Sequence, residues 1–141
     1  MDGSVDLSFE SFKDIGNIPS TQGMGWLASE LKQEDWTVSL NSMAIKEIAS
    51  MVDRTRRNPL PTLLLKPEQF EIHELQIAYQ KAKAICDRGA GFAVIDKLPI
   101  DDFEIEDMVN VYWTLGHLIG PNVAQKWDGT MIYNVTDTGK K

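Results

Sequence analysis

The sequence predicts an α+β fold in which helices precede and surround a few short strands. Two long segments carry apolar residues at helical spacing, and a short apolar run lies between a glycine and a proline. Near the end, alternating residues flank an Asp-Gly turn. The predicted order is therefore helix, helix, strand, helix and hairpin, in a chain of 141 residues that is long enough for one domain with a sizeable core.

Composition excludes several classes of protein. The formal net charge is -7, so the chain lacks the positive surface of a general nucleic-acid binder. No apolar run approaches the ~20 residues that a membrane span needs. The single cysteine, Cys86, excludes an internal disulfide framework and fits a reducing compartment. We therefore expect a cytoplasmic protein that binds neither nucleic acid nor membranes.

The chain is expected to divide into an arm and one folded domain. Residues 1–23 carry scattered acidic residues and a Pro-Ser-Thr-Gln-Gly loop, so they are predicted to form an irregular N-terminal arm. Residues 24–141 hold the periodic segments and are predicted to form the domain. Its first helix is predicted over residues 41–55, where Asn41 or Ser42 can cap the free amides at the start.

Two more helices and a strand are predicted after the first helix. The second helix is expected over about residues 68–88, and a buried strand follows at residues 92–95. The third helix is expected to begin at Asp101, because Asp101 and Glu104 have capping-box spacing. Its helical periodicity places Tyr112 in the core-facing stripe.

The last predicted element is a hairpin whose two strands flank Asp128 and Gly129. This pair is a strong hairpin signal because both residues tolerate the positive φ of a tight turn. The hairpin would expose an unpaired strand edge, and the predicted strands are too few to close a sheet around a core. We therefore expect further strands to complete the domain.

No residue pattern anchors a metal site or a nucleophilic site. Neither His73 nor His117 begins a His-x-Asp or His-x-Glu, so a 2-His-1-carboxylate triad cannot be placed. The acidic residues between positions 101 and 107 are expected to stabilise a helix start rather than to bind a metal. The sequence therefore predicts no catalytic residue and no metal ligand in this chain.

Three polar residues of the predicted hairpin are candidates for substrate binding. They are Gln125, Tyr133 and Asn134. If the hairpin lines a pocket, these amides and the phenol could orient a polar substrate. As ordinary strand residues they need no function, and this alternative stays open.

Two stretches resemble the TauD/TfdA-type oxygenases, including the clavaminate synthase-like branch. "EDWTVSLNSMAIKEI" is similar to the opening helix of that family. "CDRGAGFAVIDKLPIDDFEIEDMVNVYWTLGHLIGPNVAQKWDGTMIYNVTDTG" is similar to the part that follows. There a Gly-Phe strand leads to a Leu-Pro turn, an acidic-capped helix, a Leu-Gly turn and a Gln-bearing strand. The resemblance covers residues 34–139 as a succession of short motifs.

The resemblance implies a fold and a function. The family consists of non-haem iron(II), 2-oxoglutarate-dependent oxygenases built on a double-stranded β-helix, a jelly-roll or cupin-like fold. This chain would be the N-terminal helical buttress and first strands of such a domain. The iron ligands (His-x-Asp or His-x-Glu and a distal His) and the arginine that binds 2-oxoglutarate would follow residue 141.

The same resemblance implies the cofactors and partners. Iron(II) and 2-oxoglutarate would be bound by the intact parent, whereas this chain alone should hold neither and should be inactive. The expected partners are a small-molecule substrate and the missing C-terminal half of the domain, and a homo-oligomer stays open. Two other interpretations also remain: a non-catalytic small α+β interaction module, and a degenerate oxygenase relative that serves as a structural subunit.

Overall fold

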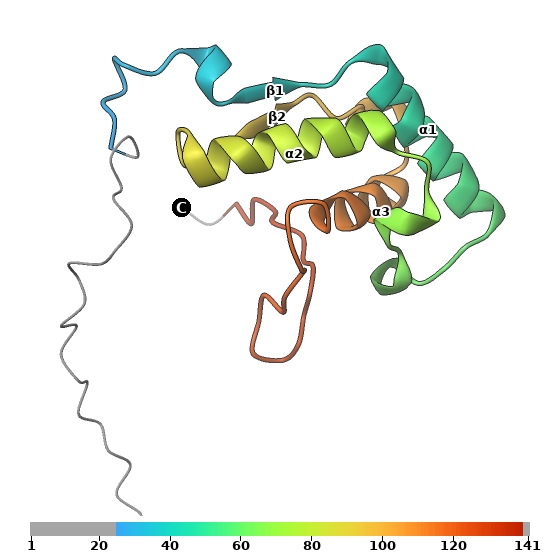
Figure 1. Ribbon diagram of the computed structural model, residues 1–141. Coiled ribbons are helices and arrows are strands. Elements are labelled where there is room, and N and C mark those ends of the chain that lie inside the picture. The colour runs from blue at the N-terminus through green and yellow to red at the C-terminus, as the bar shows by residue number, and fades with distance from the viewer. Residues whose placement is uncertain (1–24, 140–141) are drawn as a thin grey trace, which may run out of the picture.

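The computed structural model describes residues 25–139, and the predicted arm at residues 1–23 lies outside them. This part of the chain combines helices with one small sheet, which confirms the α+β class (Figure 1). The elements in chain order are β1 (Thr37–Ser39), α1 (Ser42–Arg57), α2 (His73–Arg88), β2 (Val94–Asp96) and α3 (Ile105–Gly116).

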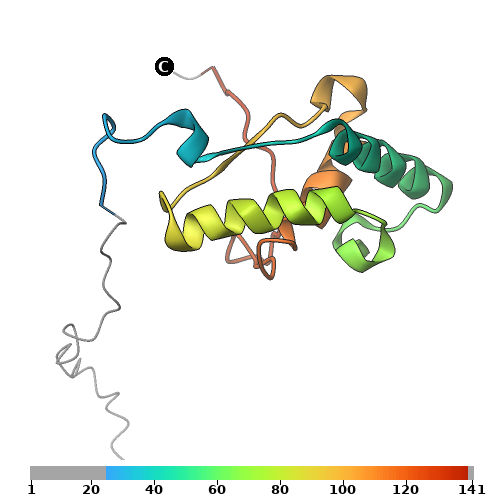
Figure 2. The same cartoon turned by 45° about the horizontal axis from the view of Figure 1, so that its top comes forward.

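The sheet consists of β1 and β2, which pair in parallel. Thr37 lies opposite Val94, and the register continues to the end of both strands. Parallel strands need a long crossover connection, and here α1 and α2 provide it. Figures 1 and 2 show α2 running alongside the two strands, while α1 and α3 lie beyond one end of the sheet.

The core lies where the three helices meet. Its buried residues are Ala44, Ile48, Met51, Val52, Ile72, Leu75, Tyr79, Met108, Val111 and Leu115. A smaller cluster joins Val38 of β1 to Ala78 and Ala82 of α2. Burial of these apolar side chains provides the main driving force for folding. The helices therefore form the stable body of the described chain, and the sheet is attached to it through α2.

The first helix agrees with its prediction. Asn41 caps α1, because its side-chain oxygen accepts a hydrogen bond of 2.8 Å from the backbone amide of Ala44. The helix continues to Arg57, two residues beyond the predicted end. The helix ends before the Asn58-Pro59 sequence, since proline cannot continue a helix.

The second helix begins later than predicted. Residues 67–69 form a separate 3-10 turn, and α2 starts only at His73. The free amides of Glu74 and Leu75 donate hydrogen bonds of 2.9 Å to the carboxylate of Glu47, which lies on α1. The start of α2 is therefore fixed by a residue of another helix, which local periodicity cannot reveal.

The predictions for β2 and α3 were wrong in three respects. The strand at residues 92–95 was expected to be buried, but β2 begins at Val94, and Val94 is 44% exposed. The third helix begins at Ile105 rather than Asp101, and no side chain caps it. Its buried face is rotated from the predicted stripe, so that Tyr112 is 64% exposed instead of lying in the core.

The predicted hairpin forms only its turn. The amide of Gln125 donates to the carbonyl of Thr130 at 2.7 Å, and Gly129 has the positive φ of 88° that the Asp-Gly pair predicts. The flanking residues of the tail (defined here as residues 121–139) are not strands in the described structure. Strand conformation depends on a neighbouring ladder, and the tail extends from α3 as an open loop (Figure 1).

Candidate functional site

A cavity of about 610 Å³ lies between the helical body and the tail. We call it the main cavity. It is lined by Tyr79, Ala93, Ile95, Leu98, Tyr112, Trp113, Gly116, Ile119, Asn122, Val123, Gln125, Met131, Ile132, Tyr133 and Val135. One wall therefore comes from α2, β2 and α3, and the tail provides the other.

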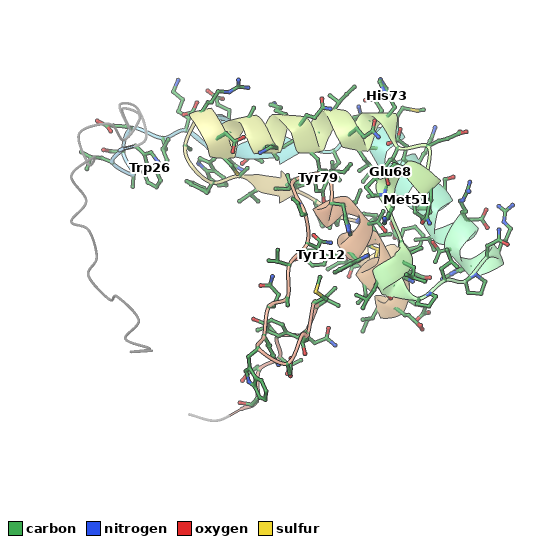
Figure 3. The ribbon with its side chains drawn as sticks, turned by 60° about the horizontal axis from the view of Figure 1, so that its bottom comes forward. Trp26, Met51, Glu68, His73, Tyr79 and Tyr112 are labelled. Carbon is green, nitrogen blue, oxygen red and sulfur yellow. The ribbon has the colours of Figure 1, made fainter. Side chains whose placement is uncertain are left out.

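Aromatic side chains form much of the wall on the helical side. Tyr79 points from α2, and Tyr112 points from α3 beside the start of the tail (Figure 3). Tyr133 approaches from the tail, so all three tyrosines of the sequence line the main cavity. None of the lining residues carries a formal charge. Such a lining suits a small molecule that is held by shape and by a few hydrogen bonds.

The Tyr79 phenol is the most perturbed group of the cavity. Burial raises the pKa of Tyr79 to about 12, and the neighbouring Tyr112 adds to the shift. The side chain is only 7% exposed. The phenol is therefore fully protonated at neutral pH and acts there as a hydrogen-bond donor. It has no tendency to serve as a general base under those conditions.

Asn122 fixes the first turn of the tail against the end of α3. Its side-chain amide donates to the carbonyl of Trp113 at 3.2 Å and lies 3.0 Å from Nδ1 of His117. A Cβ atom at Gly116 would lie 3.0 Å from the side-chain oxygen of Asn122, so glycine permits this close approach. These contacts position the tail as the second wall of the main cavity.

Trp113 adds an unusual feature to the same wall. Its indole is 5% exposed, and its Nε1 atom is buried without a hydrogen-bond partner among the described residues. A buried donor without a partner is costly and normally signals a missing acceptor. The wall around Trp113 therefore contains one donor that the described chain leaves unpaired.

The predicted substrate-binding residues lie close together. Gln125 and Tyr133 both line the main cavity. Asn134 lines an adjoining hollow of about 500 Å³, and Tyr133 is common to both. The Gln125 amide donates to the carbonyl of Val123 at 3.0 Å, and Lys126 Nζ lies 4.9 Å from the Tyr133 ring centroid. Their proposed function remains a prediction.

Tyr79 and Tyr112 are two of the lining residues that were not predicted as site residues from the sequence. Tyr79 was overlooked because it lies on α2 far from the tail in sequence, and Tyr112 was assigned to the core. A weak signal was available, because the sequence contains only three tyrosines, of which one precedes the tail and one lies within it. The third, Tyr79, could be associated with the others only by the packing of α2 relative to α3.

The described residues do not form an iron site. No group of three or more His, Cys, Asp or Glu side chains within residues 25–139 is arranged to hold a metal ion. His73 is exposed at the start of α2, whereas His117 contacts Trp113 and Asn122 at the end of α3. The two histidines thus belong to different parts of the fold. The described chain does not fit iron or its usual ligand set.

One acidic residue at the start of α3, Asp107, joins two helices, whereas the sequence predicted that the acidic residues would stabilise the helix start. Arg56 donates from Nε to Asp107 Oδ1 at 3.2 Å and from Nη2 to Oδ2 at 2.6 Å. The hydrogen bond and the negative charge of Asp107 raise the pKa of Arg56. This two-pronged ion pair links α1 to α3. Asp107 therefore supports the helical body behind the main cavity.

Comparisons with known proteins give no assignment. No protein-family model matches the chain, and no curated protein matches it. Within residues 25–139, none of the helices combines the length and the apolar character needed to traverse a bilayer.

Proposed function

We propose that this chain is the N-terminal part of a non-haem iron, 2-oxoglutarate-dependent oxygenase that oxidises a small molecule. The observation that carries the proposal is the main cavity, which contains Gln125 and Tyr133 from the Gln-bearing segment of the resemblance. The order of short motifs over residues 34–139 supports the same assignment. We propose that the residues of this chain contact the substrate and do not take part in the oxidation itself.

The iron and 2-oxoglutarate would be held by residues outside this chain, because the two histidines described above do not fit a metal site. Those groups supply the oxidising chemistry. Tyr79 and Tyr112 would bound the substrate on one side and the tail on the other. The walls would also keep water away from the part of the substrate that they cover.

The incomplete sheet supports the proposal of a double-stranded β-helix. β1 and β2 have three residues each and pair only with one another in the described structure. Apolar residues of the tail are also solvent-exposed: Val123 is 63% exposed and Val135 is 87% exposed. Further strands of a larger domain would pair with these segments and cover their apolar side chains.

The proposed activity is tested with the protein expressed from its complete reading frame. Purified protein is loaded with iron(II) without oxygen and titrated with 2-oxoglutarate. Oxygen is then admitted, and succinate is measured with and without candidate small molecules. Tight 2-oxoglutarate binding and iron-dependent succinate formation are expected. A protein that binds neither iron nor 2-oxoglutarate contradicts the enzyme and supports a degenerate structural relative.

An interaction module is the second candidate, and an exposed apolar patch favours it. Ile100 is 60% exposed, Ile105 is 79% exposed and Tyr112 is 64% exposed around the adjoining hollow. Exposed patches of this kind often mark protein contacts. A cooperative urea unfolding transition of the 141-residue chain would support this alternative. A non-cooperative transition with strong dye binding would argue against it.

A further inference from the structure

The main cavity has an uncharged lining, and the proposed reaction alone does not require this property. About one residue in four of the sequence is charged, at 25%, yet no Asp, Glu, Lys or Arg lines this cavity. The lining is instead aliphatic and aromatic, with amides and phenols as its polar groups. Since charged residues are plentiful in the chain, their absence from these walls limits which ligands can bind.

The uncharged lining should first distinguish charged ligands from neutral ones. A charged group that enters the cavity loses hydration and finds no side chain of opposite charge to replace it. A neutral apolar group loses little on leaving water and gains contact with the Tyr79 and Trp113 rings. The cavity therefore discriminates against carboxylates, sulfonates and ammonium groups.

Hydrogen bonding is the second property. The phenol of Tyr79 can donate a hydrogen bond at neutral pH, and Tyr79 lies on the helical wall. A ligand oxygen that accepts this hydrogen bond would compensate a donor that is otherwise poorly solvated.

We propose that the main cavity binds an uncharged, largely apolar small molecule that carries at least one acceptor oxygen. Calling this molecule the substrate rests on the proposed function, whereas its binding does not. The neutral lining of both walls and the Tyr79 phenol on the helical wall carry the inference. Gln125 and Asn122 provide additional amide contacts on the tail side.

A pair of dyes with related ring systems tests the preference for an uncharged ligand. N-phenyl-1-naphthylamine is neutral, and 8-anilinonaphthalene-1-sulfonate is its sulfonated relative. Fluorescence titration of the 141-residue chain, in which Val123 and Trp127 are exposed, gives both dissociation constants without iron or 2-oxoglutarate. The neutral dye should bind saturably with one-to-one stoichiometry and about tenfold more tightly than the sulfonate.

Two lysine substitutions separate the local effect from the net charge of the protein. Val123 lines the cavity and is 63% exposed, so Val123→Lys adds a cation at the cavity without disturbing the core. Trp127 is 99% exposed and does not line the cavity, so Trp127→Lys is the matched control. Val123→Lys should reduce the preference for the neutral dye by about threefold, whereas Trp127→Lys should leave it nearly unchanged.

A neutral ketone dye, Prodan, tests the acceptor oxygen. Tyr79→Phe keeps the ring but removes the phenol donor, so it should weaken Prodan binding by about threefold to tenfold. Trp127→Phe is the matched control and should leave that binding unchanged. Unchanged Prodan binding in Tyr79→Phe would overturn the role of the phenol.

The assignment of the ligand class is overturned by any of three results. These are equal or tighter binding of the sulfonate, no saturable binding of the neutral dye, and equal effects of the two lysine substitutions. Because iron and 2-oxoglutarate are absent from the assay, such a failure is distinct from a failure of the proposed oxygenase activity.

Discussion

The buried phenol of Tyr79 predicts a pH dependence of stability that one substitution can isolate. Tyr79 is 7% exposed, and burial is the larger cause of its raised pKa, followed by Tyr112. Tyr79→Phe removes the ionisable hydroxyl and keeps the ring that packs in the core. The comparison between wild type and this variant therefore reports the desolvation of a single group.

The magnitude follows from the difference between the folded and unfolded pKa values of Tyr79. The folded value is about 12 and the ordinary value is 10.0. At about 1.4 kcal/mol per pH unit, this difference corresponds to about 3 kcal/mol in total. The folded state holds the Tyr79 proton more tightly than the unfolded state does. The contribution of Tyr79 to the free energy of unfolding is therefore fully present below pH 10 and is lost as the pH rises toward 12. About half is lost by about pH 11.

Urea unfolding at about pH 9 and about pH 11 measures the effect. The free energy of unfolding of wild type, relative to Tyr79→Phe, should fall by about 1.4 kcal/mol between these two conditions. In a Tyr112→Phe protein, the same measurement should still show most of this fall in free energy, because burial raises the pKa of Tyr79 more than Tyr112 does. If the difference in the free energy of unfolding between wild type and Tyr79→Phe does not change with pH, the reasoning is refuted. That result would mean that water reaches the Tyr79 hydroxyl freely.

Three further substitutions test local structure elsewhere in the fold. Asn41→Ala removes the cap that accepts from the Ala44 amide, so it should lower the free energy of unfolding by about 1 kcal/mol; an unchanged urea midpoint would contradict the cap. Gly91 has a φ of 82°, and Gly91→Ala should lower the thermal midpoint because alanine is strained there; an unchanged midpoint would show that the loop adapts. The hydroxyl and amide of Thr130 donate to Asp128 and lower the pKa of Asp128. Asp128→Ala should therefore speed amide exchange at Thr130, and acid should do the same in wild type as the pH falls through that lowered pKa. Equal exchange rates in both proteins would argue against the contact.

Local patterns in the sequence predicted the features that local chemistry controls. The Asn41 cap and the positive φ of Gly129 depend on residues that are neighbours in the chain, and both agree with the prediction. Asp128 does not adopt the positive φ expected of the pair, and residues 121–139 contain no strand. The start of α2 depends instead on Glu47, and the pairing of Thr37 with Val94 joins residues 57 positions apart. Such non-local contacts leave no periodic signal in either segment.

The site was predictable in part for the same reason. Gln125 and Tyr133 could be proposed because they lie in one segment with a recognisable turn. Tyr79 could not, because its place in the main cavity depends on how α2 packs relative to α3. Tyr112 was assigned to the wrong face because the buried stripe of α3 is set by its contacts with α1, and sequence spacing alone does not fix that rotation.

The reading frame that follows the codon of Lys141 provides the most direct test of the proposed oxygenase. Sequencing of the transcript should reveal a His-x-Asp or His-x-Glu shortly after this position, then a distal histidine and an arginine. These residues would supply the ligands that His73 and His117 do not. A stop codon directly after Lys141, or a continuation without such a set, would contradict an active oxygenase and leave the interaction module and the degenerate structural relative as the alternatives.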